Sequence, residues 1–247
     1  MALELHPLEQ FTIHPIVRMH LPAQLGGLDV SFTNSALLMT ISVLAISALV
    51  ILGTRKAALV PGRWQSLGEL AYEFIGNMID ETVGEEGRQY FPFVFSLFMF
   101  ILFGNLLGLV PYGYTFTGQI IVTFALAATV FIGVTFIGIW RHGWKFLTFF
   151  VPHGVPIPLL LLLVPIELLS YLIRPFTLSI RLFANMLAGH TMLAIFGGFA
   201  ASIGLLGLLP LGLDVLIFFL ELLVAVLQAY VFTILTCLYL NDAIHLH

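Results

Sequence analysis

Five long apolar runs constrain this chain more than any other feature of its sequence. A helix needs about 20 consecutive apolar residues to cross a hydrocarbon core of roughly 30 Å. Backbone exposed to lipid must satisfy its own hydrogen bonds, so each run is predicted to be helical. The sequence therefore predicts an all-α polytopic membrane protein. The runs cover residues 33–53, 91–110, 119–140, 159–197 and 211–240.

Composition agrees with a membrane protein and excludes other classes. Hydrophobic residues make up 60% of the chain and charged residues only 9%, whereas a soluble domain has roughly 25% charged residues. The net charge of −4 contains no long run of one sign, so nucleic acid is not expected as a partner. The sequence has one cysteine, no phosphate-binding loop and no set of metal ligands at helical spacing. No disulfide, nucleotide, cofactor or metal is therefore expected.

Charges between the runs predict the orientation. Basic residues follow the first and third runs, which places both loops on the cytoplasmic side by the positive-inside rule. The N-terminal segment 1–32 is then outside, and residues 33–247 form a single membrane domain with a cytoplasmic C-terminus. Residues 63–88 mix charged and apolar side chains at the spacing of an amphipathic helix lying at the interface. The basic residues are Arg55, Lys56, Arg63, Arg141 and Lys145.

The last two runs are too long for upright helices. As one helix, residues 159–197 would extend about 58 Å at 1.5 Å per residue, roughly twice the hydrocarbon thickness. We therefore expect a strongly tilted helix, bent around Pro165 and Pro175. It is expected to pair with the helix of 211–240 as a hairpin, which presents a long wall to a partner.

Ionisable and polar side chains recur every seven residues along both of these runs. That spacing keeps them on one face of each helix. A charge at membrane depth costs about 2.5–3.5 kcal/mol on insertion scales, so it faces a partner, a bundle interior or water. Two facing polar seams predict an ion path. The seams contain Glu167, Ser170, Arg174, Arg181 and Asn185 in the fourth run, and Asp214, Glu221 and Gln228 in the fifth.

The two arginines of the fourth run differ in depth. Arg181 lies far from both ends of the run, and a guanidinium stays protonated, so it cannot relay a proton. It can hold an opposing carboxylate ionised, by on the order of 4 kcal/mol at about 4 Å with an effective dielectric near 20. Arg174 is nearer the start of the run, where snorkelling to a headgroup or pairing with Glu167 is the alternative to an ion-path role.

Two other residues suit a proton relay. His190 and Glu221 can both gain and lose a proton near working pH if their surroundings shift them. Nine residues turn His190 about half a revolution from Arg181, so the imidazole is expected to face away from the arginine. A structural histidine bonded to a backbone carbonyl is the alternative. Asn105 either lines a polar cavity or bonds a neighbouring helix.

Residues 178–190, LSIRLFANMLAGH, closely resemble the signature of the subunit a family of F-type ATP synthases. The family resemblance implies a non-catalytic stator subunit of the membrane sector. It also implies partners: a rotating ring of c subunits, peripheral-stalk b subunits and the rest of the complex. More loosely, the likeness covers most of the chain through residues 60–65, 104–111, 165–167, 174–176, 227–232 and 238–240.

The resemblance also implies residue roles. Arg181 is similar to the essential stator arginine that faces the ring carboxylates, with Asn185 and Gln228 as its polar neighbours. His190 and Glu221 occupy two positions associated with proton access, although some members carry the acid first and the histidine second. Two further positions bear on the family pattern: Glu167 matches a polar position, and Gly108 stands where some members have an acid.

The implied mechanism uses two offset aqueous half-channels that meet the ring near the membrane midplane. Proton flow between them would drive rotation for ATP synthesis, with the proton as the family default ion. The resemblance favours a bacterial inner membrane over an organellar one. From the residues alone, a secondary transporter or a structural scaffold remains an alternative, and the lack of an internal repeat disfavours the transporter.

Overall fold

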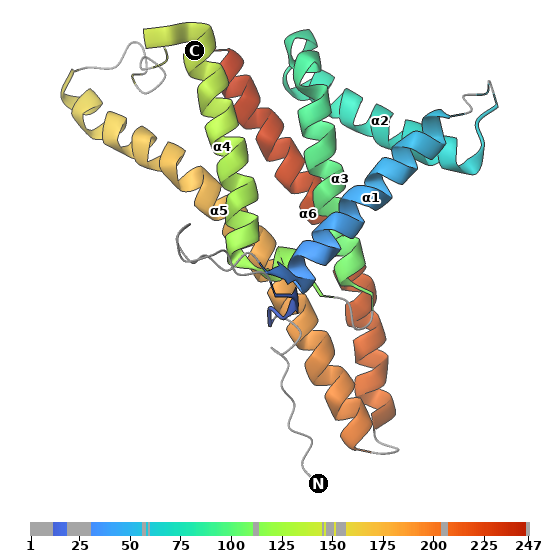
Figure 1. Ribbon diagram of the computed structural model, residues 1–247. Coiled ribbons are helices and arrows are strands. Elements are labelled where there is room, and N and C mark those ends of the chain that lie inside the picture. Colours follow the sequence, from blue (N-terminus) through green and yellow to red (C-terminus); the bar gives the residue numbers. More distant parts are fainter. Residues whose placement is uncertain are drawn as a thin grey trace.

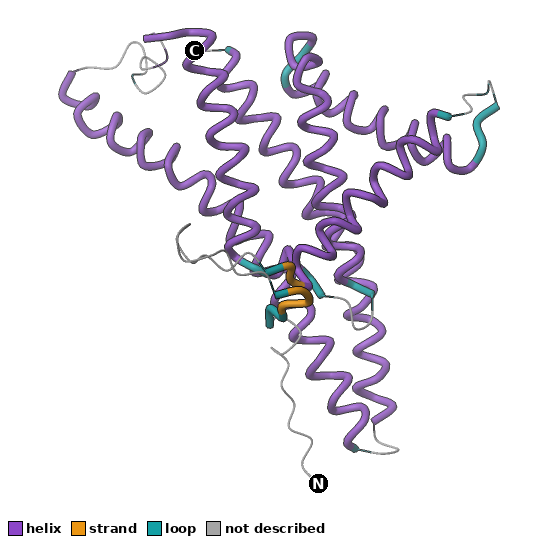
Figure 2. The backbone as a smooth tube through the Cα atoms, viewed as in Figure 1, coloured by secondary structure: helices purple, strands orange, loops and turns teal. Residues whose placement is uncertain are grey.

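In the computed structural model the described part of the chain is almost entirely helical (Figures 1 and 2). Within that part, five helices are long and apolar enough to cross a membrane, judged by length and composition. The prediction of an all-α fold with five membrane helices is confirmed. The described residues are 12–18, 31–55, 58, 60–110, 114–144, 146, 151, 157–203 and 207–245.

The helices follow the predicted runs closely. Each begins and ends within a few residues of its apolar run, because apolar length and backbone self-satisfaction fix where a spanning helix forms. Two short 3-10 helices, η3 and η4, lie in the connections. The bounds are α1 Asn34–Thr54, α2 Arg63–Thr82, η3 Glu85–Tyr90, α3 Phe91–Gly108, η4 Phe116–Gly118, α4 Ile120–His142, α5 Ile157–Ser202 and α6 Leu208–Ile244.

A short strand pair precedes α1, and the sequence did not predict it. Strand β1 (Pro15–Val17) pairs antiparallel with β2 (Phe32–Thr33). The hydroxyl of Thr33 accepts a hydrogen bond from the backbone N–H of Ala36 at 3.3 Å, which caps the start of α1. The side chain of Asn34 donates to the carbonyl of Thr12 at 3.1 Å. These contacts tie the N-terminal segment to the first spanning helix.

The amphipathic helix α2 ends earlier than its predicted end at residue 88. It stops at Thr82 because Gly84 adopts φ 83°, a left-handed conformation that favours glycine. Arg88 then reaches back to Asp80 with two hydrogen bonds, of 2.9 and 2.8 Å. The guanidinium holds the pKa of the Asp80 carboxyl below its usual value. This bidentate pair fixes the turn from α2 into η3.

Helices α5 and α6 form the predicted long hairpin. The 46 residues of α5 would extend about 69 Å, so the helix can lie within a bilayer only if strongly tilted. It continues through Pro165 and Pro175, and Figure 1 shows its first part sloping more gently than the rest. The hairpin projects beyond the ends of α3 and α4 in the same view.

The core lies where α6 packs between α3 and α5, with α4 covering α5. Val94 of α3, Val130 of α4, Leu182 of α5 and Phe232 of α6 are buried there. The outer face of the hairpin is instead covered with exposed apolar side chains, such as Ile180 with 52% of its surface exposed. A face this apolar requires lipid or another protein to cover it.

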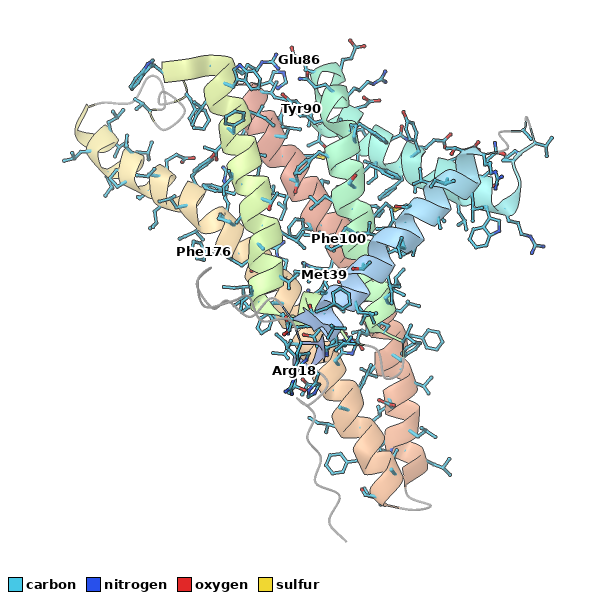
Figure 3. The ribbon with its side chains drawn as sticks, viewed as in Figure 1. Arg18, Met39, Glu86, Tyr90, Phe100 and Phe176 are labelled. Atoms are coloured by element: carbon cyan, nitrogen blue, oxygen red, sulfur yellow. The ribbon has the colours of Figure 1, made fainter. Side chains whose placement is uncertain are left out.

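The two ends of the bundle carry different groups. Glu86 and Tyr90 lie at one end, and Arg18 lies near the other, close to the start of α1 (Figure 3). Arg141 at the end of α4 pairs with Glu86, and the ring of His142 contacts the carbonyl of Ile244 at 3.0 Å. The ends of α4 and α6 therefore share one side. Two basic residues used for the orientation, Lys56 and Lys145, lie outside the described residues.

Candidate functional site

Polar side chains of α5 and α6 meet across the hairpin in antiparallel order. The amide of Asn185 donates to the Gln228 side-chain oxygen at 2.9 Å. Further along α5, Nε2 of His190 lies 3.5 Å from Oε1 of Glu221. The structure thus brings four of the predicted site residues into two neighbouring cross-helix pairs.

The imidazole of His190 lies in a buried pocket. Only 6% of the residue is exposed, and 2% of Glu221. The third member of the pocket is Thr115, which precedes η4 and places its hydroxyl 2.8 Å from Nε2. Arg181, in contrast, is exposed. The two side chains therefore occupy different faces of α5, as their spacing predicts, and the contact with Thr115 was not predicted.

Glu221 contributes a carboxylate to an apolar interior. Among the described residues, neither of its oxygens has a hydrogen-bond partner, and the only ion-pair partner within 4 Å is His190. A buried carboxylate without donors is costly when it carries a charge. The arrangement therefore favours sharing or passing a proton between Glu221 and the imidazole.

The carboxylate of Glu221 occupies space that is free because residue 189 is a glycine. A Cβ atom on residue 189 would lie 2.6 Å from Oε1 and 2.8 Å from the carboxyl carbon of Glu221. Both distances are far inside van der Waals contact, so any side chain here must displace the carboxylate. The glycine just before His190 therefore sets how closely α6 can present its acid.

We expect Gly189→Ala to move Glu221 and to slow proton flux by roughly tenfold, the rate change for one lost hydrogen-bond-scale interaction. Gly212→Ala in α6 is the matched control, because a Cβ there meets nothing within 4 Å. That control should be neutral or slightly stabilising, since alanine is the better helix former. Proton-coupled activity in membrane vesicles measures both, and equal activities would contradict the steric role of Gly189.

Arg181 has no counter-charge within its own described chain. No acidic group in the described residues forms an ion pair with it within 4 Å. In the antiparallel hairpin it lies between the Asn185–Gln228 pair and Arg174, opposite residues 229–241 of α6, which carry no charge. Within the described residues, Arg181 is thus an exposed cation without an acidic partner in the middle of an apolar helix face.

Arg174 does have an acidic partner, and it is not Glu167, the one considered from the sequence. Its guanidinium lies 3.0 Å from a carboxylate oxygen of Asp242 at the end of α6. The rings of Tyr171 and Tyr239 flank it at 5.2 and 4.8 Å. The pairing with Glu167 considered from the sequence is therefore wrong. The antiparallel register of the hairpin would have indicated Asp242.

Two predicted residues of α5 lie away from these pairs. Glu167 is half-buried and Ser170 is exposed. They precede Arg181 by roughly 21 and 16 Å along the helix at 1.5 Å per residue. The structure therefore does not bring them into contact with His190 or Glu221.

Asp214 and Asn105 lie nearer the buried pairs. Asp214 is half-buried on α6, about 10 Å before Glu221 along the helix, and its Oδ1 has no hydrogen-bond partner within the described residues. The side chain of Asn105 donates to the carbonyl of Ala225 at 3.1 Å. Of the two interpretations of Asn105, this contact supports bonding to a neighbouring helix.

The family profile described as ATP synthase A chain matches residues 36–241. The chain belongs to this family. It is 53% identical to ATP synthase subunit a of Paramagnetospirillum magneticum, over 98% of this chain and 99% of that protein. It is also 53% identical to the subunit a of Pelagibacter ubique, over 98% of each chain, and 51% identical to that of Rhodospirillum rubrum, over 98% and 99%.

Family membership identifies the role of the fold. A subunit a chain is a non-catalytic, proton-translocating stator subunit in the membrane sector of F-type ATP synthase. The chain is therefore an integral membrane protein and a member of that complex. The transporter and scaffold alternatives are set aside.

Proposed function

We propose that the outer face of α5 around Arg181 is the stator surface against which a ring of c subunits rotates. The observation that carries the proposal is a permanent cation exposed in the middle of an apolar face, without an acidic partner in the described chain. A passing carboxylate of the ring supplies the missing counter-charge. Exposed apolar side chains further along the same face, such as Met192, suit contact with another membrane helix.

The buried cluster of His190 and Glu221 is proposed as the proton access route to that surface. The pair lies on the face of α5 turned away from Arg181. Asn185 and Gln228 lie between the cluster and the arginine along the hairpin, where their hydrogen-bonded amides give the proposed route polar walls. A proton arriving by this route neutralises a ring carboxylate, which can then face lipid.

Arg181 separates the two half-channels in this mechanism. It stabilises the ionised form of a returning ring carboxylate, so the proton leaves on the other side. Because the guanidinium repels an excess proton, it prevents direct passage between the channels. Each charge that crosses gains about 2.3 kcal/mol per 100 mV, and rotation transmits this energy to the catalytic head.

The remaining polar residues are assigned by their place along the hairpin. Glu167 and Ser170 lie toward the start of α5, on the proposed exit side. Asp214 lies toward the turn between α5 and α6, on the access side together with Asn105. Arg174 with Asp242 fixes the hairpin at its open end.

The proposed setting is a bacterial inner membrane with the N-terminus outside and the C-terminus cytoplasmic. Bacterial relatives support the membrane. Arg141 lies in the last turn of α4, on the side where α6 ends, and Arg55 and Arg63 lie at the end of α1 and the start of α2, which supports the orientation. The other proposed partners are peripheral-stalk b subunits.

Cysteine cross-linking tests the stator surface. Ala184 is exposed about 60° around α5 from Arg181, so Ala184→Cys should form disulfides with cysteines placed along the outer helix of the c subunit. Ile132→Cys on α4 is the matched control, because Ile132 is exposed on another helix. Both are made with Cys237→Ala. Cross-links from the α4 position and none from residue 184 would show that the ring lies elsewhere.

A further inference from the structure

The hydroxyl of Thr115 stands between the imidazole of His190 and a backbone carbonyl. Its oxygen lies 2.8 Å from Nε2 of His190 and 3.3 Å from the carbonyl oxygen of Gly108. Only 2% of Thr115 is exposed. The contact joins residues 75 positions apart in the sequence, from the α3–η4 connection to α5.

The Thr115 hydroxyl has one proton to donate, and a carbonyl can only accept. In the tautomer of His190 that carries its proton on Nε2, the hydroxyl therefore donates to Gly108. Its lone pairs then accept from an N–H on Nε2 of His190. The proton of the imidazole is thereby held on the nitrogen that also lies 3.5 Å from Glu221.

We propose that Thr115 is a positioning residue for proton transfer between His190 and Glu221. The hydroxyl holds the Nε2–H beside the carboxylate of Glu221. The distance from Nε2 to Oε1, 3.5 Å, exceeds a normal N–H···O hydrogen bond by roughly 0.6 Å. When a proton has also been taken up at Nδ1, a small shift of the ring turns the Nε2–H from the Thr115 oxygen to the Glu221 carboxylate. Nε2 then gives its proton to the carboxylate, and the imidazole is left neutral with its proton on Nδ1. This inference rests on the proposed access role of His190.

The backbone around Thr115 leaves room for this contact. A Cβ on residue 108 would lie 2.6 Å from the hydroxyl oxygen of Thr115 and 2.8 Å from its methyl carbon. Gly108 therefore admits both branches of the threonine side chain. The hydroxyl and the methyl group of Thr115 both pack against Gly108. Packing alone could therefore explain why a threonine stands here, so substitutions must test the hydroxyl and the methyl group separately.

Two substitutions make that separation. Thr115→Val keeps the branched shape and removes the hydroxyl, whereas Thr115→Ser keeps the hydroxyl and removes the methyl. In vesicles containing the whole ATP synthase, Thr115→Val should slow proton-driven ATP synthesis by about tenfold. Thr115→Ser should retain at least roughly half of it. The opposite ranking, or equal rates, overturns the proposal in favour of packing.

Assembly of the complex is followed by immunoblotting of the membranes. If the valine variant does not assemble, Thr115→Ala replaces it, since alanine and serine differ by a single oxygen. Serine should then exceed alanine by about the same tenfold factor. Equal rates for those two variants again overturn the proposal.

A double variant separates this inference from the proposed function. If Thr115 acts through the imidazole, adding Thr115→Val to His190→Ala should cause no further loss, because the two effects share one interaction. Additive losses overturn the positioning role and leave the access role of His190 intact. Unchanged flux in His190→Ala alone contradicts the proposed access route itself, and with it the inference.

Discussion

We expect Arg181→Ala to abolish proton-driven ATP synthesis while leaving the complex assembled in the membrane. The side chain is exposed and has no acidic partner within the described chain, so its removal leaves no buried acid unpaired. What is lost is a counter-charge worth on the order of 4 kcal/mol to a facing carboxylate, which corresponds to about a thousandfold in rate. ATP synthesis by energised vesicles measures the loss.

Arg174→Ala is the matched control, since it removes the same residue type from the same helix. Arg174 already has Asp242 as its partner at 3.0 Å, with both side chains partly exposed. Its loss should loosen the open end of the hairpin slightly, by roughly 0.2–1 kcal/mol, and preserve coupling. Full coupled synthesis by Arg181→Ala would refute the assigned role, provided that the variant protein is present in the membrane.

Most of the fold follows from one property of the sequence. Apolar length predicts the five spanning helices to within a few residues, because a spanning segment must satisfy its own backbone and match the bilayer. The same length argument predicted the hairpin of α5 and α6. The length of an apolar run can be counted without knowing which residues of different helices contact each other.

The features that were missed depend on backbone conformations and contacts that leave no periodic pattern in the sequence. The early end of α2 comes from a glycine conformation and an ion pair across a turn, and the strand pair before α1 is too short to leave a periodic pattern. Thr115 lies in a connection without charge, so nothing in its surroundings in the sequence pointed to His190. Each of these requires the tertiary structure.

The candidate site was predicted in part. The seams predicted from the seven-residue step contained Asn185, Gln228 and Glu221, and the structure pairs Asn185 with Gln228. His190 was expected on the face of α5 away from Arg181, and there the structure brings it to Glu221. The same step did not predict partners, because spacing fixes the face of one helix and not its register against another. Asp242, which pairs with Arg174, was missed for this reason.

Glu221→Gln is expected to reduce proton flux by about 100-fold or more, the contribution typical of a general acid or base. The amide has nearly the shape of the carboxyl group, so it should fit beside Gly189 without repacking. It cannot accept and release a proton, however, so transfer to and from His190 stops. Initial rates of proton-driven ATP synthesis and of ATP-driven proton pumping, in the same vesicles, measure the effect in both directions.

Asp214→Asn is the comparison that isolates position from charge. Asp214 is also an acid of α6, but it is half-buried and makes no ion pair with His190 among the described residues. Its replacement removes the same charge from the same helix, about 10 Å away. A relay at Glu221 therefore predicts a much larger loss for Glu221→Gln than for Asp214→Asn. Equal losses would mean that the helix needs negative charge in general, and unchanged flux in Glu221→Gln would make that carboxyl structural.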